Sequence, residues 1–203
     1  MSIEQSVSGF HPLHNLYNDR PFLAFVWCDM KRVMIVGGPG SGKSTLAVAL
    51  GRKTGLPVYH MDKIHYRSGW NERSREEKDR LTHEVHLKDV WIFEGGHSST
   101  YAERVERADT FIWLDVPVTR RIFRVLKRSV KYNGQSRPDL AEGCPEQFNW
   151  QTVEFLRFIW RTRHSARAKL EHIYREPPDH LKVYRFSALA EIDDFLARPW
   201  QQG

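Results

Sequence analysis

Short runs of hydrophobic residues alternate along the chain with longer segments in which hydrophobic residues recur every three or four positions. The short runs favour β-strands, and the longer segments have the spacing of amphipathic helices. The pattern predicts strands at 32–36, 57–60, 90–94, 110–115 and 181–186, and helices at 43–54, 74–87, 101–106, 117–132, 147–174 and 189–196. Because strands and helices alternate, we expect βαβ units around a parallel sheet, that is, an α/β fold.

Local signals mark several of these boundaries. Gly55 stands where a helix C-cap is expected, and Ser74 with Glu77 three residues later has the spacing of a capping box. The stretch 133–146 is rich in Gly, Pro and polar residues, which is typical of a loop or a mobile flap. Residues 1–30 show no sustained periodicity, so we interpret them as an irregular N-terminal extension, with Met30 as an alternative start of the native protein.

The composition fits one globular domain in the remaining residues 31–203. The chain has 203 residues, 40% of them hydrophobic, which is enough to build a core. No hydrophobic run reaches the roughly 18–20 residues that cross a bilayer, and we see no secretion signal, so a cytoplasmic location without a membrane partner is expected. The two cysteines, Cys28 and Cys144, are far apart in sequence and are expected to be free thiols.

Positive charge is concentrated in one part of the chain. The formal net charge is +6, and residues 116–175 hold 13 Lys or Arg against 5 Asp or Glu. Such a region attracts either phosphorylated small molecules or nucleic acid, and the charge alone does not distinguish them.

The strongest motif lies directly after the first predicted strand and opens the first predicted helix. Gly37, Gly42, Lys43 and Ser44 satisfy G-x-x-x-x-G-K-S/T, the phosphate-binding loop of nucleoside triphosphatases. Its amides are expected to cradle phosphates, with Lys43 on the β- and γ-phosphates and the Ser44 hydroxyl on Mg²⁺. We therefore predict an ATP and Mg²⁺ site formed by Gly38, Pro39, Gly40, Ser41, Gly42, Lys43, Ser44 and Thr45.

A magnesium nucleotide site also needs a carboxylate at the end of a neighbouring strand. Glu94 and Asp115 each end a hydrophobic run. Glu94 precedes two glycines, which let the backbone approach a ligand, whereas Asp115 precedes Val116 and Pro117 and suits the cap of the next helix. We favour Glu94 for Mg²⁺ and a capping role for Asp115.

The order of motifs resembles one known family. The segments GGPGSGKST, HMDKIHYRSGW, WIFEGGHSST, FIWLDVP, RIFRVLKR and SRPDLAEGCPE are similar to those of the adenylate-kinase-like P-loop proteins often labelled DNA topology modulation proteins. The similarity covers about residues 31–196 and extends to nucleotide kinases and to shikimate and gluconate kinases. It implies a five-stranded parallel sheet with helices on both faces, an acceptor segment at about 61–88 and a lid at about 129–147. Glu94 stands where similar kinases usually carry aspartate.

Basic residues before and within the lid are candidates for catalysis. Arg124 and Arg128 are four residues apart, so they share a helix face, with Arg121 three residues before Arg124. The resemblance places Arg124 and Arg128 at a catalytic arginine pair, and Arg137 lies within the lid itself. Cations held there would stabilise the charge of a transferred phosphoryl group. The other arginines of this region, Arg120, Arg161, Arg163 and Arg167, are expected to be solvated.

The acceptor side is predicted around Asp62, which follows the second strand. In similar kinases an aspartate at this position accepts a hydrogen bond from the acceptor hydroxyl, and such a carboxylate can take the proton as transfer proceeds. His97 is a weaker candidate for this wall, and Trp70 suits either stacking on a base or packing in the core. The segment 185–188 resembles an adenine-side loop, with Ser187 as a plain helix cap as the alternative.

These features favour an ATP-dependent phosphotransferase whose acceptor is a nucleotide, a nucleoside or a similar small molecule. A nucleic-acid-associated ATPase affecting DNA topology and a regulatory nucleotide-binding protein are the alternatives. No helix-turn-helix, zinc-finger or RNP pattern is present, which argues against a nucleic-acid partner.

Overall fold

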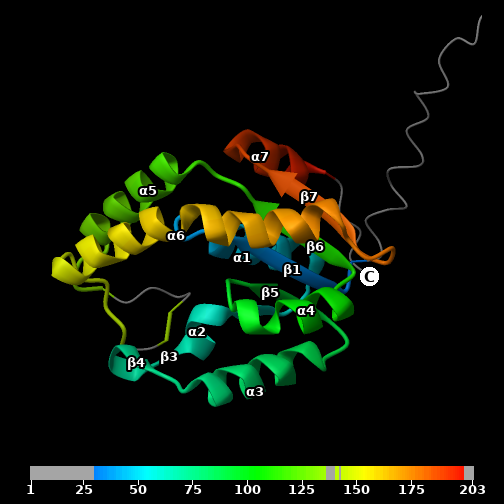
Figure 1. Cartoon of the computed structure of the whole chain (residues 1–203), viewed down its shortest axis with the longest axis horizontal. Helices are drawn as coiled ribbons and strands as arrows, with labels where there is room; N and C mark the ends of the chain where they lie inside the picture. Colours follow the sequence, from blue (N-terminus) through cyan, green and yellow to red (C-terminus); the bar gives the residue numbers. More distant parts are fainter. Residues whose placement is uncertain (1–29, 136–139, 142, 199–203) are drawn as a thin grey trace, which may run out of the picture.

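The centre of the fold is a five-stranded sheet whose neighbouring strands are all parallel (Figure 1). A computed structural model describes residues 30–135, 140–141 and 143–198. The strands are β1 (Arg32–Gly37), β2 (Val58–His60), β5 (Trp91–Glu94), β6 (Thr110–Leu114) and β7 (Lys182–Phe186), in the order β2-β5-β1-β6-β7. The predicted α/β fold is confirmed. The strands β2 and β5 lie on one side of β1, and β6 and β7, which follow later in the chain, lie on the other side. Where the strand order changes direction in this way, a crevice is expected at the carboxyl ends of the strands.

The helices that connect these strands lie where the hydrophobic periodicity predicts them. They are α1 (Lys43–Thr54), α3 (Arg75–His86), α4 (Tyr101–Arg107), α5 (Val118–Lys131), α6 (Trp150–Arg175) and α7 (Leu189–Ala197). Every predicted strand and helix is present, with bounds that agree to within three residues. The pattern was informative because most of these helices pack one hydrophobic side on the sheet and expose the other.

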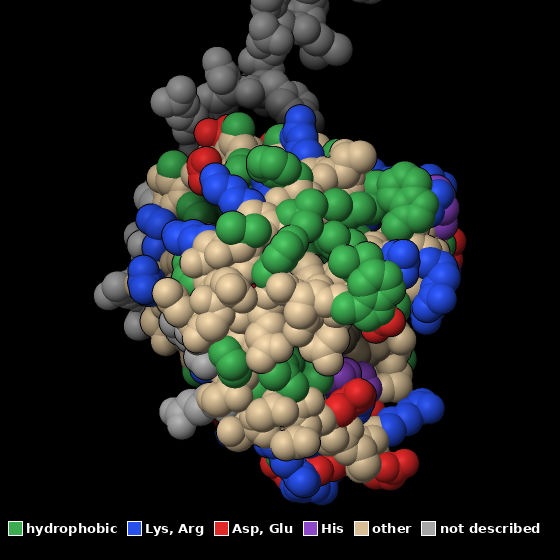
Figure 2. Space-filling view, turned by 90° about the vertical axis from the view of Figure 1, so that its left-hand side faces the viewer, with side chains coloured by type: hydrophobic (Ala, Val, Ile, Leu, Met, Phe, Trp, Pro, Cys, Tyr) green, Lys and Arg blue, Asp and Glu red, His purple; other side chains and the backbone are tan. Residues whose placement is uncertain are grey.

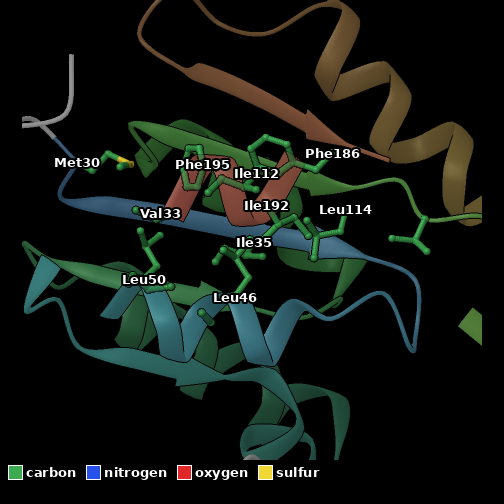
Figure 3. Close-up of a cluster of buried hydrophobic side chains, with 13 residues drawn as sticks. Met30, Val33, Ile35, Leu46, Leu50, Ile112, Leu114, Phe186, Ile192 and Phe195 are labelled. Carbon is green, nitrogen blue, oxygen red and sulfur yellow. The ribbon is translucent and has the colours of Figure 1, made fainter. Parts of the chain in front are cut away.

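The sheet is buried on both faces, as expected for parallel strands covered by helices. On one face α1 and α7 pack against β1 and β6, and in Figure 3 Leu46 of α1 and Ile192 of α7 lie on either side of Ile35. On the other face residues of α3, α4 and α6, including Leu170, pack on the aromatic side chains of β5 and β6. The central strands are hydrophobic on both sides for this reason, so they lack the alternation of a half-exposed strand.

The segment between β2 and α3 contains short elements that were not predicted. It holds α2 (Met61–His65) and the antiparallel strands β3 (Tyr66–Arg67) and β4 (Asn71–Glu72), joined by a 3₁₀ turn at Ser68–Trp70. A further 3₁₀ turn at Ser98–Thr100 precedes α4. Elements of two to five residues are too short to show a periodicity in the sequence.

The β3–β4 hairpin is held by residues far away in the sequence. The Gly69 amide donates to the Gly143 carbonyl (3.1 Å), and the Trp70 indole donates to the Pro145 carbonyl (3.0 Å). The Cys144 thiol lies between them, 3.3 Å from the Trp70 amide. Cys144 is buried and forms no disulfide among the described residues. Trp70 is 38% exposed, so it neither fills the core nor points freely into solvent.

The predicted helix ends are largely confirmed. Gly55 is the left-handed C-cap of α1, and its amide bonds to Gly51. Ser74 caps α3 by accepting from the Glu77 amide (3.2 Å), but the Glu77 carboxylate binds Arg67 and Arg73 instead of completing the capping box.

The division of the chain into an N-terminal extension, a kinase-like domain and a lid remains a prediction. Except for Met30, which is buried in the core, the predicted extension 1–30 lies outside the described residues, and so does Cys28. Of the predicted lid 129–147, the described parts include a bridge between Asn133 and Glu146. Among the residues that the structure describes, no helix combines the length and the hydrophobicity that a membrane span requires.

A buried polar cluster lies between α3, α4 and the end of β5. The Arg104 side chain is fully buried, and its guanidinium donates to the Gly95 carbonyl (2.8 Å) and lies over the Phe93 ring. Its Nε donates to His86 Nε2 (3.3 Å), so His86 carries its proton on Nδ1, 3.3 Å from Glu103. Burial, helped by the charge of Arg104, lowers the pKa of His86 to about 4. His86 is therefore neutral in the folded protein at neutral pH.

This lowered pKa predicts acid-sensitive stability. Between about pH 6.5 and pH 4 the unfolded chain binds a proton at His86 that the folded chain does not, so stability falls as the pH falls through this window. Acidification from about pH 7.5 to about pH 5 should cost about 2 kcal/mol through this group alone. Urea unfolding of wild type and of His86→Gln at both pH values measures this loss of unfolding free energy. His172→Asn, at an exposed histidine, is the control. An equal acid loss in wild type and His86→Gln would contradict the assignment.

Candidate nucleotide and acceptor site

The carboxyl ends of β1, β5 and β6 open into one cleft of about 940 Å³. The loop after β1 lines its centre. The other walls come from the start of α2, the end of β5, the first residues of α4, and α5 and α6. The cleft thus brings together most of the predicted site residues: Gly38, Pro39, Gly40, Gly42, Lys43, Ser44, Thr45, Asp62, Glu94, Arg124 and Arg128.

The loop between β1 and α1 has the shape of an anion cradle. Gly42 is the N-cap of α1 with φ 100°, a left-handed conformation that favours glycine, and no side chain caps the helix. The first amides of this twelve-residue helix and its positive dipole end therefore face the cleft. Lys43 Nζ lies 3.4 Å from the Gly38 carbonyl, so the ammonium folds back over the loop. Ser41 is not among the residues that line the cleft: its side chain is buried, and its amide bonds to the Gly38 carbonyl within the loop (3.1 Å).

Glu94 and Ser44, the two predicted magnesium ligands, are in contact. The Ser44 hydroxyl donates to Glu94 Oε1 (2.9 Å), and His60 Nδ1 donates to the same oxygen (2.8 Å). Burial by itself would raise the pKa of the 2% exposed Glu94 carboxyl, but the His60 hydrogen bond, the Lys43 charge and the Ser44 bond outweigh it and lower the pKa. Glu94 is therefore ionised, and because the Ser44 hydroxyl donates its hydrogen bond to Glu94, the lone pairs of this hydroxyl are left for a cation. These hard oxygen donors fit Mg²⁺.

Three arginines of α5 lie along the phosphate loop. Arg124 donates to the Ser41 carbonyl (3.2 Å), and Arg128 lies 3.1 Å from Glu146. Arg121 is 8% exposed, and its Nε donates to the Val116 carbonyl (3.1 Å). Burial lowers the pKa of Arg121, although the charge of Asp115 opposes this. Arg124 and Arg128 thus line the cleft from one helix face as predicted, whereas Arg137 lies outside the described residues.

The predicted acceptor residues are only partly brought together. Asp62, in the first turn of α2, lines the cleft with Gly96, Ser98 and Tyr101. His97 does not line it, because its Nε2 binds Asp79 of α3 (2.6 Å).

The expectation of a capping role for Asp115 is wrong. The N-cap of α5 is Pro117, and no side chain caps that helix. Asp115 instead binds Arg167 in a bidentate pair (3.1 and 3.0 Å) and Arg185 at 2.6 Å. Arg167 is therefore an ion-pair partner at the cleft wall, and its side chain is 43% exposed, as its prediction as a solvated residue implies. Asp115 joins the ends of β6 and β7 to α6, and its carboxylate is occupied by these two partners.

The segment after β7 forms the N-terminal cap of α7. The Glu191 carboxylate accepts hydrogen bonds from the amides of Ser187 (2.6 Å) and Ala188 (3.1 Å). Ala188, and not Ser187, is the N-cap of α7. The alternative in which Ser187 caps the helix is therefore wrong by one position, and the amides of both residues are bound by Glu191.

Several cleft residues were missed by sequence reasoning. His60 ends a predicted strand beside Glu94 in the register of β2 and β5, so the strand order would have revealed it. From α6, the described residues Phe155, Phe158, Thr162 and Arg163 also line the cleft. Arg163 was expected to be solvated, but it lies over the Trp160 ring (4.1 Å) and donates to the Trp160 carbonyl. The helix itself was predicted, but its periodicity did not indicate which of its residues line the cleft.

Comparison with known proteins places the chain among proteins of this architecture. A family model described as AAA domain (AAA_18) matches residues 33–139, slightly more than half of the chain. No curated protein sequence matches it significantly. The structure of shikimate kinase from Acinetobacter baumannii in complex with shikimate has a TM-score of 0.51 at 15% identity, covering 85% of this chain and 92% of that one. The two chains share a fold.

Two other structures give lower scores. Shikimate kinase from Bacteroides thetaiotaomicron has a TM-score of 0.48 at 18% identity, covering 82% of this chain and 94% of that one. A gluconokinase from Sinorhizobium meliloti 1021 has a TM-score of 0.47 at 15% identity, covering 82% and 89%.

Because Arg121 packs directly on the phosphate loop, we predict that adding one methyl group at Gly38 weakens the binding of ATP. A Cβ at Gly38 would overlap the Arg121 guanidinium, so Gly38→Ala must displace either the loop or the arginine. We expect affinity for magnesium ATP to fall by about tenfold or more, equivalent to about 1.4 kcal/mol. Isothermal calorimetry measures the affinity. Gly55→Ala, at the far end of α1, has no atom within 4 Å of its added Cβ and introduces only the strain of a left-handed backbone, so it is the control for a general loss of stability. Unchanged binding by Gly38→Ala would show that this loop does not hold the phosphates.

Proposed function

The chain belongs to the AAA domain family, and we propose that it is a magnesium-dependent ATP phosphotransferase acting on a nucleotide, a nucleoside or a similar small acceptor. The single observation that carries the proposal is the composition of the cleft. One cavity is lined by a phosphate loop with its lysine, by the contacting Ser44 and Glu94, and by Asp62. A phosphoryl donor and an acceptor could both reach this cavity.

The phosphate loop and its neighbours would hold the donor. The amides at the start of α1 bind phosphate oxygens, and Lys43 neutralises their charge. Ser44, oriented by Glu94, would hold Mg²⁺, with the Glu94 carboxylate directly beside it. Bound Mg²⁺ supplies neutralisation of charge on the β- and γ-phosphates. His60 keeps the Glu94 carboxylate turned toward Ser44, so these oxygen donors are arranged in advance.

The arginines of α5 would stabilise the transferred group. Transfer spreads negative charge over the oxygens of the γ-phosphoryl group, and fixed cations beside it lower the barrier without having to reorganise. Arg124 is fixed by the Ser41 carbonyl and Arg128 by Glu146. Arg137, in the same basic part of the sequence, remains a candidate for a third such contact.

A nucleic-acid-associated ATPase would use the same loop differently. Its activity would rise with added DNA, and its DNA affinity would fall steeply with salt. A kinase instead releases ADP in response to a small acceptor. Many basic side chains around the cleft already have protein partners, among them Arg167 and Arg121. This pairing leaves less cationic surface for a nucleic-acid backbone than the sequence suggests.

The proposed activity predicts acceptor-dependent ADP release. A coupled assay over nucleoside monophosphates, nucleosides and hydroxylated metabolites should find turnover in wild type and none in Lys43→Ala. The lysine is required because its ammonium folds over the loop, where it would neutralise the charge of the phosphates. Calorimetry of ATP binding accompanies the assay. Turnover stimulated only by DNA, or equal ADP release in the Lys43 variant, would refute the proposal.

The arginine contacts predict a loss of turnover. Arg124→Ala and Arg128→Ala should each lower kcat by about 100-fold or more with little change in ATP affinity, because their charge matters most in the transition state. Arg120→Ala, at an exposed arginine of α5 that does not line the cleft, is the matched control. A change confined to KM for ATP would assign the two arginines to ground-state binding.

A further inference from the structure

The cleft has an acceptor half that can be distinguished from its donor half. Around the phosphate loop, Asp62, Gly96 and Tyr101 line the cleft from α2, the end of β5 and α4. Helix α4 packs on the same sheet face as α6, while α1 and α7 cover the opposite face. The later part of α6, at Leu170, packs on this face, and earlier residues of the same helix line the cleft.

Two aromatic rings on α6 line the same cleft as Asp62. Phe155 and Phe158 line the cleft, and their rings lie nearly parallel, with an interplanar angle of 13° and centroids 6.3 Å apart. They are 37% and 45% exposed, although they stand among charged residues. Exposed aromatic rings inside a polar cleft provide a surface on which a planar ligand can stack. Such stacking tolerates any heteroaromatic base, because every base has a π-face.

The charges of this half oppose an acceptor that carries a phosphate. Asp62, which follows β2 in the first turn of α2, is a carboxylate that lines the cleft. The cations of the cleft are held elsewhere: Arg121, Arg124 and Lys43 contact the phosphate loop of the donor half, Arg128 binds Glu146, Arg163 the Trp160 carbonyl and Arg167 Asp115. An acceptor phosphate beside Asp62 would be repelled by its carboxylate, whereas the cations on the phosphate loop would face the donor. A hydroxyl, by contrast, can donate a hydrogen bond to Asp62.

We propose, on the basis of the proposed kinase activity, that the acceptor is an uncharged nucleoside, with its base stacked on Phe155 and Phe158 and a sugar hydroxyl donated to Asp62. The hydroxyl oxygen forms a bond to the γ-phosphorus of ATP, and the bond from that phosphorus to the bridging oxygen breaks. The electron pair of the broken bond stays on the oxygen of ADP. The hydroxyl proton passes to the Asp62 carboxylate and then to solvent. The products are ADP and a nucleoside monophosphate.

A control for the two phenylalanines of α6 is found on the neighbouring helix α5. Large hydrophobic side chains are exposed elsewhere on α5 and the first half of α6, and hydrophobic side chains gather at this end of the molecule (Figure 2). Phe123 is the most exposed of them at 66%, and it does not line the cleft. It therefore provides a matched control, because its replacement changes the same residue type on a neighbouring helix without touching the acceptor half.

The test compares three sets of acceptors with the full chain and magnesium ATP. Ribonucleosides, their 5′-monophosphates and the non-aromatic compounds shikimate, gluconate and glucose are assayed for ADP release, and mass spectrometry identifies any phosphorylated product. We expect ribonucleosides to gain one phosphoryl group. Phe155→Leu and Phe158→Leu should each raise the KM for the nucleoside by about tenfold, the scale of one lost stacking contact, with KM for ATP unchanged. Asp62→Asn should lose kcat, and Phe123→Leu should behave as wild type.

The outcomes separate this inference from the proposed function. Phosphorylation of the monophosphates or of the non-aromatic compounds, but not of nucleosides, overturns the inference and leaves a kinase. ATP binding without phosphorylation of any acceptor also overturns it. Absence of ATP binding to wild type in calorimetry overturns the proposed function itself, and the inference with it. Equal KM values for the nucleoside in the wild type and both Phe→Leu variants would exclude the stacking surface.

Discussion

One oxygen atom of Glu94 ties together the three elements on which the cleft depends. Oε1 accepts hydrogen bonds from Ser44 at the start of α1 and from His60 at the end of β2, while Glu94 itself ends β5. Because the carboxylate is buried, water cannot readily replace either donor. His60 is followed directly by α2, which carries Asp62. The same pair of hydrogen bonds therefore positions the phosphate loop and the proposed acceptor carboxylate relative to each other.

The charges around this oxygen depend on one another. Arg104 is completely buried, and no carboxylate lies within ion-pair distance of it among the described residues. Burial lowers its pKa to about 10, while the charges of Tyr101 and Glu94 oppose this shift. Its guanidinium donates to the carbonyl of Gly95, the residue after Glu94. The buried Arg104 cation thus contacts the residue next to the buried Glu94 anion, and the two charges reduce each other's cost, since an uncompensated charge in the interior is strongly unfavourable.

Sequence reasoning located the elements and the centre of the site because both depend on local patterns. The phosphate loop is a contiguous motif, Glu94 ends a hydrophobic run, and Arg124 and Arg128 follow helical spacing. The roles of Asp115 and Trp70 could not be predicted in the same way. Asp115 binds arginines 52 and 70 residues further along the chain, and the Trp70 indole binds a carbonyl 75 residues away. Such partners become neighbours only through the order of the strands and the path of the chain around them.

Folding changes which ligands the basic part of the sequence can bind. Residues 116–175 carry an excess of positive charge that, taken alone, suits nucleic acid as well as ATP. In the folded chain, Arg167 is paired with Asp115 and Arg128 with Glu146, while Arg121 is buried against the phosphate loop. A guanidinium held by a carbonyl or carboxylate keeps its charge but loses freedom to follow a flexible polyanion. It is suited instead to a small group that forms its charge in one fixed place, which is the requirement of phosphoryl transfer.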